Sequence, residues 1–314
     1  MTPRLIGRLA TVDLGTNTVR LLVVEPDGPA WRTLQQSQRV TRLGEGQGDT
    51  GRLGPEPMRR TSATVAEFAR AARALGAGRV RIVATSAVRE AVNREEFVAR
   101  LERESGERVE VVSGEEEARL TLKGVTSGLP GLGGSFVLFD IGGGSTEFVL
   151  ARGAVPAAAV SLRLGVVALQ EEWGDPGPVR WEHFARLRRH VEQRLAAEVP
   201  EAIAGASAAE MVGTAGTVTT LAALELGLRA YDAAAVHGYR LERAAVERQL
   251  ARLGALGVEA RGRLPCLEPG RADVIIPGIA ICLAAMARCG RETLVVSDRG
   301  LREGILCELL GTAA

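Results

Sequence analysis

The chain has 314 residues, a length that favours about two domains, and 46% of them are hydrophobic, which is enough for a sizeable core. The net charge is +1 at pH 7, so the overall charge gives no reason to expect DNA or an acidic membrane surface as a partner. No apolar run approaches the roughly 18 to 20 residues of a membrane span, and residues 1–10 are too short in their apolar part for a secretory signal, so we expect a cytoplasmic protein.

The first predicted elements form a strand hairpin that the chain repeats. Residues 9–25 (LATVDLGTNTVRLLVVE) read as an apolar strand, a Gly-Thr-Asn-Thr turn and a second apolar strand. Residues 137–151 (VLFDIGGGSTEFVLA) have the same form. Aligning Asp13 with Asp140 also aligns the first glycine of each turn and the apolar run that follows, so the chain carries an internal repeat.

Helices and strands alternate between and after the two hairpins, which indicates an α/β fold. Before residue 137 we predict, in order, a loop over 44–57, a helix over 58–77, a strand over 79–87, a helix over 94–106, a strand over 108–114 leading into 115–125, and a loop over 126–135 that crosses between domains. After residue 151 we predict a helix over 181–199, a strand and turn over 210–217, helices over 218–227, 241–254 and 273–290, a strand over 293–297 and a last helix from Leu301. The four cysteines lie in the last fifth of the chain without metal-site spacing and are predicted to be reduced, buried thiols.

Three glycine turns follow strands and suggest phosphate binding. They are DLGTNT at 13–18, DIGGGST at 140–146 and GTAGT at 213–217. One such turn is weak evidence, but consecutive backbone N–H groups in turns of this kind form anion-binding concavities. Lys123 is the only lysine, and no GxxxxGK[ST] motif is present, so an anion site must use arginine or backbone N–H groups.

These segments resemble the phosphate and adenosine motifs of the actin-like ATPase superfamily. Within it, the whole chain is similar to the exopolyphosphatase/guanosine pentaphosphate phosphatase (Ppx/GppA) family in its short, two-domain form. The similarity rests, in order, on VDLGTNTVRLLV, ATSAVREAVN, VSGEEEARL, FDIGGGSTEFVL, VGTAGT, HGYRL and VSDRGLREGIL. It implies a duplicated actin-like (ribonuclease H-like) α/β fold in which domain I (1–125, with the helix 299–314 returning to it) faces domain II (126–298) across a cleft.

The resemblance also assigns a catalytic base and a metal site. Judged alone, the Glu115–Glu117 run reads as a solvated helix start; in the family, the glutamate at the position of Glu117 activates water. Asp140 and Glu147 match the family's magnesium-associated acidic pair, so Mg²⁺ is the expected cofactor. Asp13 either reaches the metal through water or caps its own turn.

Arg89 matches a family residue that contacts substrate phosphate, a role for which a guanidinium is suited. The full set of predicted phosphate-binding residues is Gly15, Thr16, Asn17, Thr18, Arg89, Gly142, Gly143, Gly144, Ser145, Thr146, Gly213, Thr214, Gly216 and Thr217. His237 is predicted to be structural, because no partner motif accompanies it. Arg299 and Arg302 are predicted to be domain-packing or hinge residues.

The resulting hypothesis is an exopolyphosphatase that releases terminal orthophosphate from polyphosphate by magnesium-assisted attack of an activated water. A guanosine pentaphosphate 5′-phosphohydrolase is the rival enzyme, although no aromatic residue adjoins GTAGT to stack on a base. A superfamily kinase is less favoured, because nothing indicates an acceptor substrate. A binding sensor without turnover would not need Glu117. The substrate is the only partner we expect, apart from a second copy of the chain, which the sequence leaves open.

Overall fold

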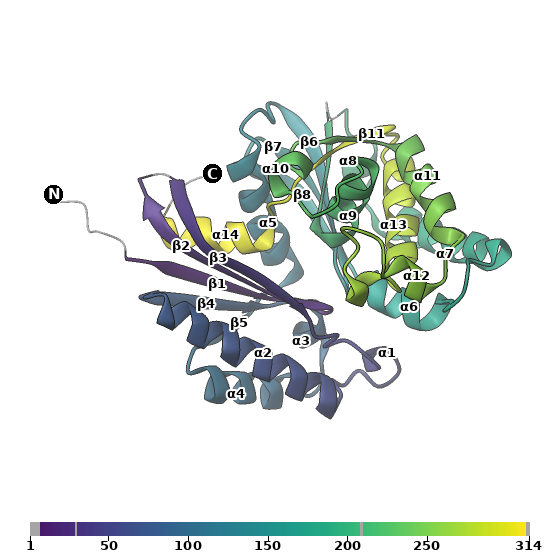
Figure 1. Ribbon diagram of the computed structural model, residues 1–314. Helices are drawn as coiled ribbons and strands as arrows, with labels where there is room; N and C mark the ends of the chain where they lie inside the picture. The colour runs from purple at the N-terminus through teal and green to yellow at the C-terminus, as the bar shows by residue number, and fades with distance from the viewer. Residues whose placement is uncertain (1–6, 29, 208–209, 312–314) are drawn as a thin grey trace. The chain divides into compact units, whose positions relative to one another are not determined.

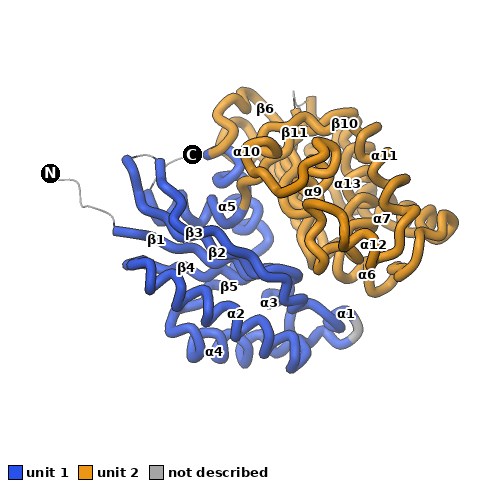
Figure 2. The backbone as a smooth tube through the Cα atoms, in the orientation of Figure 1, with its two compact units in different colours: residues 1–127, 301–314 blue, residues 128–300 orange. Residues whose placement is uncertain are grey.

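The computed structural model describes residues 7–28, 30–207 and 210–311. The chain divides into two compact units (Figure 2): unit 1 consists of Met1–Ser127 and Leu301–Ala314, and unit 2 of Gly128–Gly300. Each unit is built on a β-sheet of its own, with helices packed on it (Figure 1).

Unit 1 contains a five-stranded sheet in the order β3-β2-β1-β4-β5. The strands are β1 (Leu9–Leu14), β2 (Thr18–Asp27), β3 (Ala30–Val40), β4 (Arg79–Ala84) and β5 (Val109–Val111). The first three pair antiparallel, whereas β4 and β5 run parallel to β1. The helices are α1 (Gln47–Thr50), α2 (Pro55–Ala74), α3 (Ser86–Glu90), α4 (Arg94–Ser105), α5 (Gly114–Gly128) and α14 (Leu301–Leu310).

Side chains of β1 alternate between two cores, as the twofold period of a strand requires. Val12 packs in the same cluster as Phe68 of α2 and Phe97 of α4, on one face of the sheet. Leu9 packs with Leu306 of α14 on the other face. Asp13 therefore lies on the α14 side.

Unit 2 contains a six-stranded sheet in the order β10-β11-β9-β6-β7-β8. The strands are β6 (Ser135–Ile141), β7 (Thr146–Arg152), β8 (Val155–Leu162), β9 (Glu210–Thr214), β10 (Arg240–Glu242) and β11 (Thr293–Val296). The helices are α6 (Val166–Trp173), α7 (Trp181–Glu198), α8 (Glu201–Ala204), α9 (Ala215–Glu225), α10 (Ala233–Val236), α11 (Arg243–Gly254), α12 (Val258–Arg261), the 3₁₀ helix η1 (Pro269–Arg271) and α13 (Ile275–Arg288).

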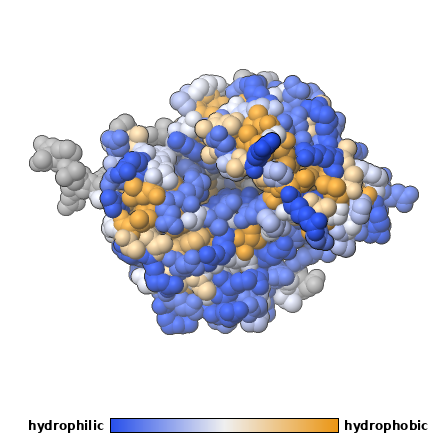
Figure 3. Space-filling view, viewed as in Figure 1, coloured by the Kyte–Doolittle hydropathy of each residue, from blue (hydrophilic) through white to orange (hydrophobic). Residues whose placement is uncertain are grey.

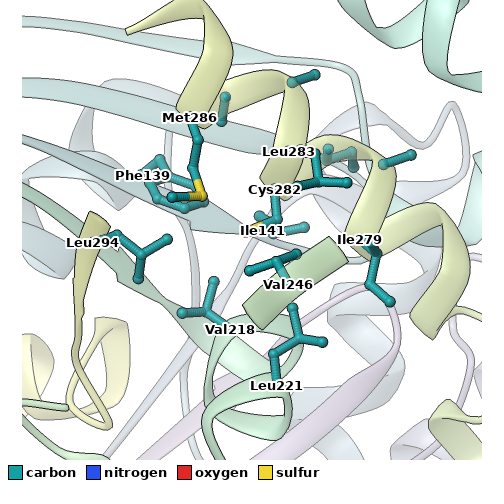
Figure 4. Packing of buried hydrophobic residues seen from close by; sticks show 14 of the residues in the cluster. Phe139, Ile141, Val218, Leu221, Val246, Ile279, Cys282, Leu283, Met286 and Leu294 are labelled. Atoms are coloured by element: carbon teal, nitrogen blue, oxygen red, sulfur yellow. The ribbon is translucent and has the colours of Figure 1, made fainter. Parts of the chain in front are cut away.

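The core of unit 2 is organised around α13, which is apolar on nearly all sides. Its residues Ile279, Cys282 and Met286 are fully buried and lie among Phe139 of β6 and Val218 of α9 (Figure 4). A helix that is hydrophobic all round belongs in a protein core or a membrane; in the described part of the chain, no helix is long and apolar enough to cross a bilayer. The face shown in Figure 3 is largely hydrophilic, with several hydrophobic patches among the hydrophilic residues.

The two sheets confirm the predicted duplication. Both hairpins have the same register: Asp13 pairs with Arg20 in β1 and β2, and Asp140 pairs with Glu147 at the equivalent positions of β6 and β7. In both sheets the hairpin is extended by an antiparallel third strand on one side and by parallel strands on the other. The α/β class and both hairpins are therefore confirmed.

Several predicted boundaries are wrong for identifiable physical reasons. The predicted loop 44–57 contains α1 and the start of α2, because Pro55 occupies the first helical position, where its missing N–H costs nothing. The helix α5 continues to Gly128, past the predicted start of the loop at 126. The strands β3 and β8 were not predicted, because their largely exposed positions carry no continuous apolar signal.

Thiol chemistry provides a test of the packing in unit 2. Three of the four unbonded cysteines are buried, but Cys266 is partly exposed, contrary to prediction, and its Sγ donates to the carbonyl of Leu228 at 3.2 Å. Burial raises the pKa of Cys282 to about 12 and that of Cys289 to about 11. A thiol reagent at about pH 7 should therefore modify Cys266 first in the folded protein. Mass spectrometry before and after denaturation tests this, and equally fast labelling of Cys282 would contradict it.

Candidate active site

The turn between β1 and β2 in unit 1 is held by hydrogen bonds within itself and to two neighbouring segments. Gly15 N–H donates to the carbonyl of Thr18 at 3.1 Å, and the carbonyl of Thr16 accepts from Gly44 N–H at 3.0 Å. The Thr16 hydroxyl also accepts from Ala87 N–H, at 3.2 Å, which joins the turn to α3. The N–H groups of Thr16 and Asn17 make no hydrogen bond to any described residue. Two successive donors are thus available to an anion.

Arg89 and Glu117, predicted from separate motifs, are in direct contact. Arg89 Nη1 donates to Glu117 Oε2 at 2.8 Å and to the carbonyl of Val112 at 3.1 Å, while Arg89 Nε donates to Glu90 at 3.2 Å. Glu117 lies in the first turn of α5 and is 8% exposed. Within the described residues, Arg89 Nη2 makes no hydrogen bond, so two N–H donors of this guanidinium remain available. The pair thus places a carboxylate beside unused cationic donors.

The other two glutamates of the acidic run have different environments. Glu115 is exposed, whereas Glu116 forms an ion pair with Arg119 at 2.7 Å. The backbone N–H of Glu116 donates to the hydroxyl of Ser113, which caps the start of α5. Of the three glutamates, only Glu117 is buried and paired with Arg89.

The turn between β6 and β7 in unit 2 is the counterpart of the first turn. Gly142 N–H donates to the carbonyl of Ser145 at 2.9 Å, and the carbonyl of Gly143 accepts from Val167 N–H at the start of α6, also at 2.9 Å. The N–H groups of Gly143, Gly144 and Ser145 bond to no residue in the described ranges. Because the carbonyls are engaged with α6 and the N–H groups are not, the turn presents successive donors, as the triple glycine predicts.

Asp140 and Glu147 are cross-strand partners in the hairpin that this turn closes. Glu147 is 2% exposed, and the hydroxyl of Ser161 in β8 donates to its Oε1 at 2.6 Å. Two carboxylates directly opposite each other repel, so the pair is suited to a cation. Among the described residues, no group of three or more His, Cys, Asp or Glu side chains is placed to hold a metal. The pair alone fits Mg²⁺, which usually takes one or two carboxylates and keeps several waters.

The segment GTAGT is not a turn, contrary to prediction. Gly213 lies inside β9, between β6 and β11, where an added Cβ would come within 2.9 Å of the Phe139 ring. The helix α9 begins at Ala215, so Gly216 and Thr217 belong to its first turn. Gly213 is therefore a packing glycine, and the N–H groups that this segment can offer to an anion are those at the amino end of α9.

Comparison with known proteins identifies the family. The model of the Ppx/GppA phosphatase family matches residues 22–313. The chain belongs to the Ppx/GppA phosphatase family. It is 37% identical to Exopolyphosphatase 2 of Mycobacterium tuberculosis, over 98% of this chain and 99% of that protein. It is 31% identical to Exopolyphosphatase 1 of Mycobacterium leprae, over 98% and 91% of the two chains.

Two solved structures agree with this assignment. An exopolyphosphatase from Cytophaga hutchinsonii superposes with a TM-score of 0.90 at 25% identity, covering 98% of this chain and 99% of that one. A Ppx/GppA family member from Aquifex aeolicus superposes with a TM-score of 0.81 at 34% identity, covering 97% and 98%. This Ppx/GppA phosphatase is accordingly a hydrolase with the duplicated α/β fold of its family.

His237 has a structural position in the Ppx/GppA chain. Its Nδ1 accepts from the N–H of Asp298 at 3.1 Å, so its Nε2 carries the proton and donates to the carbonyl of Gly128 at 2.9 Å. The hydroxyl of Thr214 donates to the carbonyl of Arg299 at 3.0 Å. In unit 1, Arg302 pairs with the adjacent Glu303 at 2.6 Å. A hinge role for Arg299 and Arg302 stays a prediction.

Sequence reasoning missed the surroundings of Asp13. Arg20 Nη1 lies 3.6 Å from Asp13 Oδ2, and the charges of Arg302 and Glu303 also act on this carboxyl. The internal repeat could have indicated this neighbour, because the alignment of Asp13 with Asp140 also aligns Arg20 with Glu147. In the first hairpin of the Ppx/GppA chain a carboxylate thus lies opposite an arginine, whereas in the second hairpin two carboxylates lie opposite each other.

Substitution Asp13→Asn is expected to stabilise the protein at neutral pH. Burial raises the pKa of Asp13, and the nearby arginines only partly oppose it. A carboxyl with a raised folded-state pKa favours folding when protonated, and this contribution is lost as the pH rises through the folded-state value. The variant should gain about 0.5–2 kcal/mol at about pH 7 and little near pH 4. Urea unfolding at both values tests this; a loss of stability at neutral pH would contradict it.

Proposed function

We propose that this chain is an exopolyphosphatase that releases terminal orthophosphate from inorganic polyphosphate. The family membership supports phosphoric-anhydride hydrolysis, and the relatives from M. tuberculosis and M. leprae carry the name exopolyphosphatase. The observation that carries the proposal is the contact between Arg89 and Glu117 at the start of α5.

Each member of this pair has a distinct role in the proposed reaction. The Glu117 carboxylate accepts a proton from the attacking water as the water oxygen bonds to the terminal phosphorus. The bridging P–O bond to the rest of the chain breaks, and the shortened polyphosphate leaves with that oxygen and its negative charge. The Nη2 donors of Arg89 bind oxygens of that phosphoryl group, on which negative charge is concentrated. Because Arg89 also holds Glu117 through Nη1, the base and the phosphate ligand stay at a fixed separation.

Each unit by itself also offers backbone donors to phosphate oxygens. The N–H groups of Thr16 and Asn17 in unit 1, of Gly143 and Gly144 in unit 2, and of the first turn of α9 suit phosphate oxygens of a polyanion. These donors are held by the fold before substrate binds, so they need little reorganisation when charge shifts to the leaving phosphate.

We further propose that Asp140 and Glu147 hold Mg²⁺. The ion would neutralise charge on the phosphate oxygens when bound. Ser161 keeps the Glu147 carboxylate in place, and the cross-strand register keeps Asp140 opposite it. This part of the proposal rests on the burial of Glu147 and on the strand pairing that places the two carboxylates on one face of the sheet.

A single assay tests the proposed function. Purified protein with Mg²⁺ is offered long polyphosphate, tripolyphosphate, guanosine pentaphosphate and ATP separately, and released phosphate is measured. Release from polyphosphate is expected. Release from guanosine pentaphosphate alone would instead establish the 5′-phosphohydrolase, and binding of polyphosphate without release would establish a sensor.

Removal of the metal should stop the reaction, and the Glu147→Gln variant should need more Mg²⁺ than the wild type. Chelation is expected to abolish phosphate release, and added Mg²⁺ should restore it. In Glu147→Gln, the Mg²⁺ concentration for half-maximal rate should rise at least about tenfold. The reason is that Mg²⁺ would lose one of its two carboxylate ligands, and each carboxylate contributes strongly to the affinity for the ion. Glu171→Gln, in a carboxylate outside the hairpin, is the control. An unchanged Mg²⁺ requirement in Glu147→Gln would contradict the metal assignment.

A further inference from the structure

Unit 1 contains a second cationic feature that the proposed chemistry does not use. A groove of about 750 Å³ opens where the first residues of β4 and β5, the middle of α5 and the end of α14 meet. Its volume is in the range of ligand sites. We call it the basic groove; its lining residues are Arg79, Val80, Arg81, Arg108, Glu110, Lys123, Glu308, Leu309 and Gly311.

The two acidic side chains of the basic groove form ion pairs. Arg81 donates to Glu110 at 2.8 Å and to Glu308 at 2.7 Å, and Arg119 also donates to Glu308. Both acidic side chains in the lining are therefore engaged by arginines.

Three further cations line the groove without neutralising an acid. Arg79, Arg108 and Lys123 make no ion pair and no side-chain hydrogen bond with the described part of the chain. Arg79 and Arg108 are exposed, and Lys123 is partly buried. The lining thus has four cationic side chains (Arg79, Arg81, Arg108 and Lys123) and two acidic ones (Glu110 and Glu308), a net charge of +2, which attracts an anion that carries several charges in a row.

The basic groove is separate from the Arg89–Glu117 pair. The parallel strand β4 begins at Arg79 in the groove and ends at Ala84, just before α3, so at about 3.3 Å per residue the two ends lie about 17 Å apart. Lys123 is likewise about 9 Å beyond Glu117 along α5, at the helical rise of about 1.5 Å per residue. A single phosphate cannot touch both places, whereas an extended chain can.

We propose that the basic groove is an accessory binding site for inorganic polyphosphate, which holds part of a long chain away from the catalytic pair. The identity of this ligand rests on the proposed function. Polyphosphate fits better than nucleic acid, because none of the described lining residues is aromatic and stacking on bases is therefore absent. The consequence is selection for chain length: long chains gain contacts that short chains cannot make.

Kinetics with two matched double variants test this. Arg79→Gln with Arg108→Gln removes two charges from the basic groove; Arg70→Gln with Arg103→Gln removes two from other exposed positions in unit 1. In the groove variant, KM for long polyphosphate should rise about tenfold, with kcat and the tripolyphosphate parameters unchanged. The control should match the wild type. Equal long-chain KM values in the two double variants would overturn the proposal.

Lysine modification gives a readout independent of turnover. Because Lys123 is the only lysine, an amine reagent followed by mass spectrometry of its peptide reports on the basic groove in the unaltered protein. With a chelator present, long polyphosphate should slow modification of Lys123 severalfold, tripolyphosphate should not, and the groove variant should lose the protection. Absence of protection, or equal protection by single-stranded DNA, would overturn the assignment. If the wild type releases no phosphate at all, the proposed function fails, but protection of Lys123 still tests whether polyphosphate binds in the basic groove.

Discussion

Replacement of Glu117 by Gln is expected to lower the rate of phosphate release about 100- to 10,000-fold, the usual contribution of a general base. The substitution keeps the size of the side chain and an oxygen that can accept from Arg89 Nη1, so the guanidinium should stay where it is. What is lost is the ability to take a proton from water. The measurement is kcat on polyphosphate, together with direct binding of the chain, which should change by only a few fold.

The control for this experiment lies in the same acidic run. Glu115→Gln changes the charge of the same helix turn by the same amount, but Glu115 is exposed. Its kcat should stay within about twofold of the wild type, since surface substitutions of this kind usually have small effects. A Glu117→Gln enzyme with normal turnover would disprove the assignment of the base. Loss of activity in both variants would point to helix-start electrostatics instead.

Substitution Gly165→Ala is expected to remove most of the activity and to destabilise unit 2. An added Cβ at this position would lie 2.3 Å from the Gly143 carbonyl oxygen and 2.4 Å from the Gly144 carbonyl carbon. Both atoms are backbone of the turn between β6 and β7, so relief of the clash must displace that turn. We expect about 1–3 kcal/mol of destabilisation and at least a roughly 100-fold lower rate, because positioning errors of about 1 Å are costly.

Gly177→Ala is the matched control, because no atom of the described residues lies within 4 Å of an added Cβ there. It should retain activity and unfold at the wild-type urea concentration. Urea unfolding reports the effect of each substitution on packing, and the rate of phosphate release reports its effect on the position of the turn. A Gly165→Ala protein that is less stable yet fully active would show that the turn between β6 and β7 can move without consequence, which would contradict its proposed phosphate-binding role.

Much of the site could be predicted because its key residues follow strands directly. Apolar alternation on both sides of a glycine turn indicates each hairpin, and the internal repeat relates one hairpin to the other. The turns at 13–18 and 140–146 were thus found correctly. The turn predicted at 213–217 was wrong. In the sequence, a glycine that makes room for the Phe139 ring cannot be distinguished from one that makes room for a ligand.

Local sequence pattern is enough to establish the α/β class, the duplication and the residue types at the two turns, because these depend on periodicity and on the backbone freedom of glycine. Which distant groups meet depends on the tertiary structure instead. Arg89 and Glu117 are far apart in the sequence and come together because β4 and β5 end side by side. Gly165 approaches the turn between β6 and β7 closely, and Arg79, Arg108 and Lys123 gather in the basic groove. Both arrangements likewise arise from packing between elements, which no local pattern encodes.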